Sequence, residues 1–312
     1  MTIMLYNKKV MFMRDFFSNC DLCPRKCNIN RHIKVGVCGA ADKMVVARAS
    51  LHMWEEPCIS GDTGSGTIFF SGCNLKCIFC QNIQISNQII GKEITIEEFA
   101  TICLNLQKQK ANNINLVTPT PYVPLIVEGI KLAKKKGLNI PVVYNTSGYE
   151  TIDTIKMLDG IVDIYLPDLK YYDDNFAVKY SHVKDYFKHA SNAIYEMYTQ
   201  VGKPIFDNNG IMKKGVIVRH LMLPGLKSDT KEILNYLYKT YHNNIYISIM
   251  NQYTPIRHFE VNTELNQTIS ENDYDEIINY ALDLGIKKAF IQEGGTDSTS
   301  FIPDFLNQDL PL

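Results

Sequence analysis

The sequence predicts an α/β fold: a full or partial (β/α) barrel with parallel strands, preceded by a small cysteine-rich N-terminal segment. From residue 64 onward, short β-branched runs alternate with longer helical patterns. Repeated strand–helix–strand units imply parallel strands joined by right-handed crossovers. Several runs are apolar on both faces, as strands covered by other layers must be. A series of this length favours a barrel over an open doubly wound sheet, although periodicity alone does not decide.

The strands are predicted from β-branched and aromatic runs. They are expected at 66–71, 114–118, 140–145, 162–167, 216–223, 245–250 and 288–292. Functional side chains are expected at the carboxyl ends of these strands, where parallel α/β folds place their sites.

The helices between the strands have recognisable ends. They are expected at 95–110, 122–136, 150–159, 174–201, 229–241 and 271–284. Thr95 and Glu98 predict a capping box at the start of the first helix. Serine N-caps and glycine stops are predicted at Ser228, Ser270, Gly137 and Gly285.

Composition narrows the class of protein. Lys and Arg total 32 against 33 Asp and Glu, so the basic footprint of a nucleic-acid-binding protein is missing. No run approaches the ~20 apolar residues of a membrane span, and the first residues lack the apolar core of a signal peptide. We therefore expect a cytoplasmic protein, in which the nine cysteines are metal ligands rather than disulfides.

Two regions are expected along the chain. Residues 1–63 do not fit the strand–helix alternation and carry five of the nine cysteines. They are predicted to form a separate metal- or iron–sulfur-binding segment. Residues 64–312 are predicted to form the barrel core with a C-terminal extension.

A loop directly after the first predicted strand carries three cysteines. Cys73, Cys77 and Cys80 follow the pattern C-x3-C-x2-C within residues 71–82. A structural zinc site normally takes four protein ligands, so three thiolates leave such a site one ligand short. One interpretation is a zinc or cluster site completed by a distant fourth ligand. The other is a four-iron cluster with one iron left open, because an open coordination position distinguishes a catalytic metal site from a structural one.

This loop resembles the signature of radical S-adenosylmethionine (SAM) enzymes, including the aromatic Phe79 just before the last cysteine. The resemblance implies that the three cysteines hold a 4Fe-4S cluster whose fourth iron chelates SAM. One electron then splits the sulfonium to give methionine and a 5′-deoxyadenosyl radical, which abstracts hydrogen from a substrate. In such chemistry the protein supplies position and electronics. Phe79 is expected near the adenine, with a plain core aromatic as the alternative.

Two later stretches are similar to glycyl-radical activating enzymes of the pyruvate formate-lyase activating type. Asp168 and Lys170 match an Asp-x-Lys pattern, and Arg219 matches an Arg-bearing strand. Residues two apart on a strand point the same way, and the resemblance implies that Lys170 pairs with the methionine carboxylate. The alternative is a strand-end surface ion pair. Arg219 is expected to fork onto a carboxylate, whereas alternation turns His220 to the opposite face.

The family also carries a Gly-Gly-Glu stretch after its second strand, and this chain departs from it. Residues 115–124 read NLVTPTPYVP, with neither adjacent glycines nor a glutamate. Thr118 and Thr120 are expected to substitute there as hydroxyl partners. After the third strand, Asn145 and Ser147 offer an amide and a hydroxyl to the ribose or methionine part of SAM. A turn with no ligand role is the alternative.

Four further cysteines lie close together near the N-terminus. Cys20, Cys23, Cys27 and Cys38 follow the pattern C-x2-C-x3-C-x10-C. Four thiolates close a site without an open position, so this second site is expected to hold either a structural zinc or an electron-passing iron–sulfur cluster. Spacing does not separate zinc from iron.

Together these features predict a radical SAM oxidoreductase similar to pyruvate formate-lyase activating enzyme-like proteins. Family resemblance implies a flavodoxin- or ferredoxin-type one-electron donor and makes a protein glycine one candidate hydrogen donor. Two other classes stay open. A non-catalytic iron–sulfur electron carrier or cluster-transfer protein would explain the cysteines, but not the long (β/α) series with polar strand ends. A zinc-dependent binding module is the third hypothesis.

Overall fold

The computed structural model describes residues 15–292, 305 and 310–312. Within them, parallel strands appear at all seven predicted places. These strands are β2 (Ser65–Phe70), β4 (Ile114–Val117), β5 (Val142–Thr146), β6 (Ile164–Pro167), β8 (Met212–Leu221), β9 (Tyr246–Met250) and β10 (Ala289–Ile291). Neighbouring members of this series pair in parallel, from β2 through to β10. The predicted α/β class is therefore confirmed.

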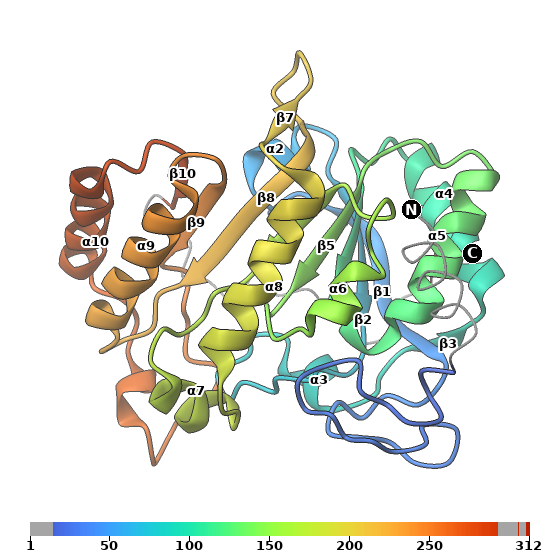
Figure 1. Cartoon of the computed structure of the whole chain (residues 1–312), viewed down its shortest axis with the longest axis horizontal. Coiled ribbons are helices and arrows are strands. Elements are labelled where there is room, and N and C mark those ends of the chain that lie inside the picture. Colours follow the sequence, from blue (N-terminus) through green and yellow to red (C-terminus); the bar gives the residue numbers. More distant parts are fainter. Residues whose placement is uncertain (1–14, 293–304, 306–309) are drawn as a thin grey trace, which may run out of the picture.

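The sheet is an open path rather than a closed ring among the described residues. Its order is β10-β9-β8-β6-β5-β4-β2-β1-β3, and the two-residue β7 (Ile205–Phe206) pairs with β8. The outermost strands β10 and β3 (Lys92–Ile94) are not neighbours in that order. This arrangement matches the partial-barrel form of the prediction, and Figure 1 shows the sheet curving behind the helices.

One strand of the sheet was not anticipated from the sequence. β1 (Met44–His52) lies within residues 1–63, yet it pairs with β2 in antiparallel fashion and β3 pairs with β1 on the other side. Residues 15–43, before β1, form turns, bends and irregular backbone, and this part of the chain lies beside α3 (Ile83–Asn87) at the bottom of Figure 1. The division of the chain at residue 63 stays a prediction.

The helices cover one side of the sheet in Figure 1. In addition to α3 they are α2 (Pro57–Ser60), α4 (Ile96–Lys108), α5 (Val123–Lys135), α6 (Ile152–Lys156), α7 (Asp174–Ser181), α8 (Tyr186–Val201), α9 (Lys227–Tyr241) and α10 (Glu271–Leu284), with short 3-10 turns η1 (Thr120–Tyr122) and η2 (Thr263–Asn266). The Thr95–Glu98 capping box and the Ser270 N-cap are both present. Gly137 and Gly285 have positive φ just after α5 and α10, as the predicted helix stops require.

Two helix predictions were wrong. The single helix expected over 174–201 is two helices, because His182 and Asp185 adopt left-handed backbone conformations that break it. Ser228 is not an N-cap: α9 begins one residue earlier, and its N-cap residue, Leu226, makes no side-chain cap. Both errors arise at turns whose geometry is fixed by packing between elements.

A continuous hydrophobic core lies between the sheet and the helices and includes buried residues from the parallel strands and from α4, α5, α8 and α9. The strands β2, β4 and β6 are buried along their whole length, as expected for strands covered on both faces. Among the described residues, none of the helices combines the length and apolarity that a membrane span needs.

Candidate active site

A cavity of about 310 Å³ lies at the carboxyl ends of the parallel strands. That volume is at the small end of the range typical of small-molecule sites. Ten of the eleven barrel residues predicted to hold a cluster or SAM line this cavity: Cys73, Cys77, Phe79, Cys80, Thr118, Asn145, Ser147, Asp168, Lys170 and Arg219. The structure thus brings together residues from β2, β4, β5, β6 and β8 that are far apart in sequence.

The three-cysteine loop is fixed by hydrogen bonds from several elements. Tyr122 donates its hydroxyl to the carbonyl of Ser71 (2.9 Å), where the loop leaves β2. Asn74 donates its side-chain amide to the carbonyl of Tyr149 (2.7 Å), and Ile78 donates its N–H to the carbonyl of Tyr180 (2.9 Å). The loop is therefore held at both ends and in the middle, although it is irregular.

Gly72 is required by the path of this loop. Its φ is +88°, and a Cβ at this position would lie 2.7 Å from the carbonyl oxygen of Cys38. A larger residue is thus excluded by conformation and by space. The same contact means that the four-cysteine segment packs directly against the first turn of the three-cysteine loop.

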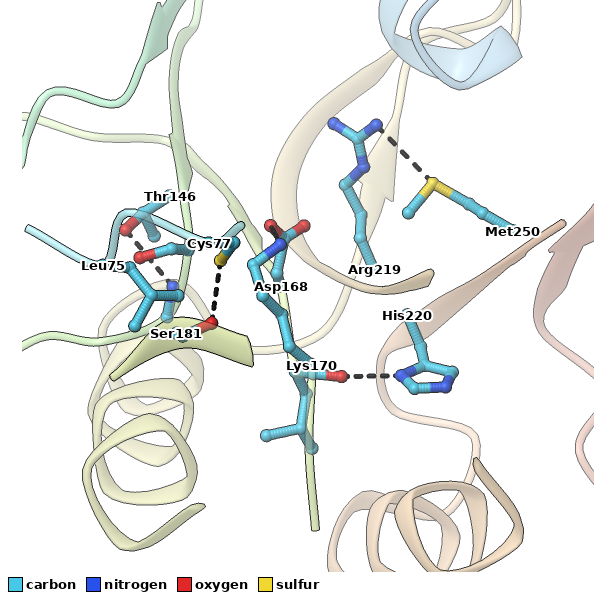
Figure 2. A network of polar contacts seen from close by, with 12 residues as sticks. Leu75, Cys77, Thr146, Asp168, Lys170, Ser181, Arg219, His220 and Met250 are labelled. Carbon is cyan, nitrogen blue, oxygen red and sulfur yellow. Dashed lines mark hydrogen bonds and ion pairs between the residues drawn. The ribbon is translucent and has the colours of Figure 1, made fainter. Parts of the chain in front are cut away.

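The thiols of the loop are close enough to influence one another. Burial raises the pKa of Cys80 to about 12, and the charges of Cys77 and Cys73 raise it further. Burial also raises the pKa of Cys77, whose Sγ accepts a hydrogen bond from Ser181 Oγ at 3.0 Å (Figure 2). With their pKa values raised, the free Cys77 and Cys80 thiols stay protonated at neutral pH, and a bound cation would stabilise them as thiolates.

Asp168 and Lys170 form an ion pair inside the cavity and not on the outer surface. Lys170 Nζ lies 2.6 Å from Asp168 Oδ2, and the two side chains are only 16% and 21% exposed. Burial lowers the pKa of Lys170, but the charges of Asp168, Cys77 and Cys80 and the hydrogen bond to Asp168 together outweigh burial and raise the pKa above its ordinary value. Lys170 therefore stays an ammonium group facing the cavity, next to Cys77 in Figure 2.

Tyr186 on α8 connects the ends of β5 and β6. Its hydroxyl accepts a hydrogen bond from the backbone N–H of Lys170 (2.9 Å) and lies 2.8 Å from the carbonyl of Ser147, to which it donates. Within the described residues, the buried Oγ of Ser147 has no hydrogen-bond partner. An unpaired buried hydroxyl that lines a cavity is a group that a ligand could satisfy.

Thr118 has the backbone conformation of a glycine. Its φ is +58° at the end of β4, where it lines the cavity. Such a conformation costs of order 1 kcal/mol for a residue with a side chain, and strain of this kind is concentrated at ligand sites. The stretch that departs from the family's glycine pair therefore keeps a left-handed turn at this point.

Glu150 places a buried carboxylate beside the same stretch. Its Oε1 accepts hydrogen bonds from Thr120 Oγ1 (2.6 Å), Thr146 Oγ1 (2.6 Å) and Tyr144 OH (3.1 Å). Burial raises the pKa of Glu150 to about 7, against the three hydroxyl bonds, which lower it. Thr120 was predicted to offer its hydroxyl to SAM. In the structure this hydroxyl faces Glu150, and Thr120 is not among the residues that line the cavity. Sequence reasoning gave Glu150 no role, although it follows the Asn145–Ser147 turn directly.

Arg219 is already paired with the protein's own carboxylates. Its Nη1 lies 3.2 Å from Glu55 Oε2 and its Nε lies 3.3 Å from Glu56 Oε1, and both glutamates are nearly buried. Its Nη2 contacts the sulfur of Met250 at 3.6 Å (Figure 2). The fork onto a carboxylate therefore exists within the chain, and the cofactor role expected for Arg219 stays a prediction. The partners could not be inferred because they are 164 and 163 positions away in sequence.

Phe79 lies on the cavity wall, and His220 faces away from the cavity as strand alternation predicts. The adenine contact expected for Phe79 stays a prediction. Phe79 is both cavity-lining and buried, and its ring meets those of Tyr180 and Tyr253 edge to face. His220 is not among the cavity-lining residues: its Nδ1 donates to the carbonyl of Leu169 at 2.7 Å. Burial lowers the pKa of His220 to about 4, so it is a neutral group that holds the backbone between Asp168 and Lys170.

The N-terminal cysteines lie near enough to influence one another's pKa. Burial raises the pKa of Cys23 to about 12, and the charges of Cys38 and Cys27 add to it; Cys38 in turn is influenced by Cys20 and Cys27. Lys26 and Asn28 have positive φ on either side of Cys27, which turns the chain sharply around that thiol. In the described part of the chain, no three or more histidine, cysteine, aspartate or glutamate side chains are grouped so as to hold a metal ion. The metal content of both cysteine sets stays a prediction.

Comparison with known families identifies the class of protein. The model of the radical SAM superfamily matches residues 67–237, more than half of the chain. This stretch begins in β2 and includes the three-cysteine loop and all other predicted SAM contacts. The chain therefore belongs to the radical SAM superfamily.

The individual relatives share 30% or less of their residues with this chain. An uncharacterized protein of Methanocaldococcus jannaschii is 30% identical over 289 residues, which cover 89% of this chain and 78% of that protein. The pyruvate formate-lyase-activating enzyme of Clostridium pasteurianum is 28% identical over 199 residues, covering 61% of this chain and 74% of that enzyme. Among solved structures, native anSMEcpe with bound AdoMet is 15% identical with a TM-score of 0.49, covering 71% of this chain and 61% of that chain.

Proposed function

We propose that this chain is an enzyme that holds a 4Fe-4S cluster on Cys73, Cys77 and Cys80, cleaves SAM reductively and abstracts hydrogen from a substrate. The observation that carries the proposal is the position of the three thiols on the wall of a cavity of about 310 Å³ that Asp168 and Lys170 also line. When bound, such a cluster supplies one electron that splits SAM into methionine and a 5′-deoxyadenosyl radical.

The side chains around the cavity suit both groups. Three thiols on the cavity wall offer the soft ligands that iron–sulfur clusters take, and ligation to iron would reverse the raised pKa values of Cys77 and Cys80. The unpaired hydroxyl of Ser147 and the ammonium of Lys170 offer hydrogen bonds to a carboxylate. The carboxylate of Asp168 is the matching acceptor for an amine. An amino-acid group with both charges therefore finds partners at this end of the cavity.

Each cavity residue then has a task in positioning SAM. Lys170 binds the methionine carboxylate, and Asp168 orients Lys170 and accepts from the amine. Asn145 and Ser147 contact the methionine or ribose part, and Thr118 keeps the backbone turn next to them. Phe79, held by Tyr180 and Tyr253, packs near the adenine. Outside the cavity, Tyr186 and His220 hold the N–H and the carbonyl of the peptide group that joins Leu169 to Lys170.

The proposal is tested by product analysis of anaerobically reconstituted protein. With SAM and dithionite, the iron-loaded wild type is expected to form 5′-deoxyadenosine and methionine in equal amounts. Cys77→Ala is expected to lose this activity, because only two thiols then remain at the site. Cys103→Ala serves as the matched control: Cys103 is buried on α4 and belongs to neither cysteine set, so this variant should keep it. Equal product from wild type and Cys77→Ala contradicts the proposal.

The hydrogen donor is proposed to be a protein glycine. Similarity over 199 residues to the pyruvate formate-lyase-activating enzyme of Clostridium pasteurianum supports this class of substrate. The test captures proteins on the iron-loaded chain from an anaerobic lysate of cells grown with α-deuterated glycine, so that the glycine residues of the captured proteins carry the label. Deuterium in 5′-deoxyadenosine supports glycine as the donor. Transfer only from another deuterated residue, or from a small molecule, contradicts it.

The four N-terminal cysteines are proposed to form a second, closed site that holds zinc or an iron–sulfur cluster. The proposal is supported by the influence that these cysteines have on one another's pKa, which requires them to lie near each other. A flavodoxin- or ferredoxin-type protein is the proposed source of electrons. Metal analysis of wild type and Cys27→Ser identifies the metal of the second site. Equal zinc and equal iron in the two proteins would contradict it.

A further inference from the structure

Arg25 lies in the four-cysteine segment, between Cys23 and Cys27, but its side chain reaches into the three-cysteine loop. Its Nε donates to the carbonyl of Asn74 at 2.9 Å and its Nη2 to that of Leu75 at 3.2 Å. Both carbonyls belong to the three residues between Cys73 and Cys77. One guanidinium group therefore joins the two cysteine sets directly.

The same guanidinium also binds the backbone around Ser181, which contacts Cys77. Nη1 donates to the carbonyl of His182 at 2.7 Å, and Nη2 lies 3.2 Å from the carbonyl of Ser181. Ser181 is the residue whose hydroxyl donates to Cys77 Sγ, and Figure 2 shows Leu75, Cys77 and Ser181 together. Arg25 thus fixes the backbone of the loop and of the serine that contacts the middle thiol. The planar fork of arginine makes four such contacts possible at once.

The rest of the four-cysteine segment makes two similar contacts. Arg31 is buried and donates to the carbonyl of Pro121 at 2.6 Å, three residues beyond the strained Thr118. Thr154 Oγ1, in α6 just after the Asn145–Glu150 stretch, donates to the carbonyl of Leu22 at 2.6 Å. The segment is therefore bound to the loops that follow β2, β4 and β5. Those three loops supply six of the cavity's predicted cluster and SAM residues.

We propose that Arg25 is a positioning residue through which the closed four-cysteine site sets the geometry of the three-cysteine loop and so the affinity for SAM. The proposal rests on the proposed function, because it concerns how the SAM site is shaped. It gives the closed site a role that a simple electron relay does not have. A relay changes how fast the open cluster is reduced, whereas positioning changes how well the reduced or oxidised protein binds SAM.

The test compares iron-loaded Arg25→Ala with the wild type by EPR spectroscopy of the reduced protein. SAM is titrated, and the concentration that gives half of the SAM-induced spectral change is measured. We expect Arg25→Ala to raise this concentration roughly 10- to 100-fold, the usual effect of removing an outer-shell partner of a metal site. Millimolar guanidinium ion is expected to restore part of the affinity, and Arg25→Lys to lose less than Arg25→Ala.

Lys34→Ala is the matched control, since it removes a cation from an exposed position of the same segment and should leave the titration unchanged. If Arg25→Ala fails to fold or to hold iron, Arg25→Lys decides by the same titration. A half-saturating SAM concentration equal to that of the wild type overturns the proposal. If the wild type itself shows no SAM-induced change, the proposed function fails first, and the two failures are thereby distinguished.

Discussion

Residues 20–38 and residues 71–82 are both irregular, cysteine-bearing segments with residues in the left-handed region. In both, burial raises a thiol pKa to about 12, at Cys23 and at Cys80. They differ in what surrounds the thiols. Residues 71–82 form one wall of the cavity, together with strand ends that carry charge, whereas none of the described residues from 20 to 38 lines it.

This difference in surroundings is the ground for proposing a different role for each set of cysteines. Four thiols can satisfy a metal completely, so the segment at 20–38 has no need of a cavity. Three thiols leave a position to be filled from outside, and a cavity with a matching Asp168–Lys170 pair is what an incoming ligand requires.

The largest contrast is expected between one thiol removed from each segment. Cys80→Ala should lower the rate of SAM cleavage by roughly 10³-fold or more, as expected for an essential part of a catalytic unit. Cys27→Ala should lower it roughly 10- to 100-fold, through positioning. The rate of 5′-deoxyadenosine formation under saturating dithionite measures both. Equal losses in the two variants would remove the functional distinction between the segments.

The next contrast concerns the charged strand end. Lys170→Met should raise the SAM concentration for half-maximal cleavage roughly 100-fold, because a partly buried charge contact is lost. Lys227→Met removes an ammonium from an exposed pair with Asp273 and is expected to have little effect. Steady-state measurements of both variants decide. A Lys170→Met enzyme with unaltered SAM dependence would show that Lys170 serves only Asp168.

Glu150 is linked both to the N-terminal cysteines and to the cavity wall: its charge raises the pKa of Cys23, and its Oε1 accepts a hydrogen bond from Thr146. Its pKa rises from 4.5 to about 7 on folding, so the folded state binds more protons between these values and stability falls as pH rises through this window. Glutamine does not titrate, so Glu150→Gln removes this loss of stability at rising pH. Relative to wild type, the variant should gain stability from pH 5 to pH 8, by at most about 3 kcal/mol.

Thermal unfolding of the two iron-loaded proteins at several pH values measures this difference. The variant keeps an acceptor for the three hydroxyls, so the two proteins should be similar at pH 5. A difference that does not change between pH 5 and pH 8 would mean that Glu150 does not titrate in this range.

The smallest contrast uses one left-handed residue from each segment. Thr118→Gly and Lys26→Gly should each raise the free energy of unfolding by about 1 kcal/mol, because both relieve a strained backbone. Only Thr118→Gly should also weaken SAM binding, by a few-fold, because a freer turn costs more to order on binding. Denaturant titration and SAM titration test the pair. Weaker SAM binding in Lys26→Gly but not in Thr118→Gly would contradict this prediction.

Much of the fold and of the site was predictable from the sequence. The strand–helix alternation predicts seven parallel strands, and polar residues at strand ends predict the cavity lining, because parallel carboxyl ends meet at one edge. Contacts between remote segments were not predictable. Arg219 meets Glu55 and Glu56, and Arg25 meets the loop at 73–77, because folding brings together positions with no shared periodicity. β1 was missed since strand pairing, rather than alternation with a helix, defines it.

The most direct test of the central claim, that the three-cysteine loop leaves one iron for SAM, is magnetic resonance with labelled SAM. The iron-loaded, reduced protein is mixed with SAM carrying ¹⁵N in its amine and ¹⁷O in its carboxylate. Electron–nuclear double resonance then reports contact between the cluster and the labels. The account predicts couplings to both labels in wild type and in Cys27→Ser, and none in Cys77→Ala. Fully iron-loaded wild-type protein with no coupling to either label would contradict it.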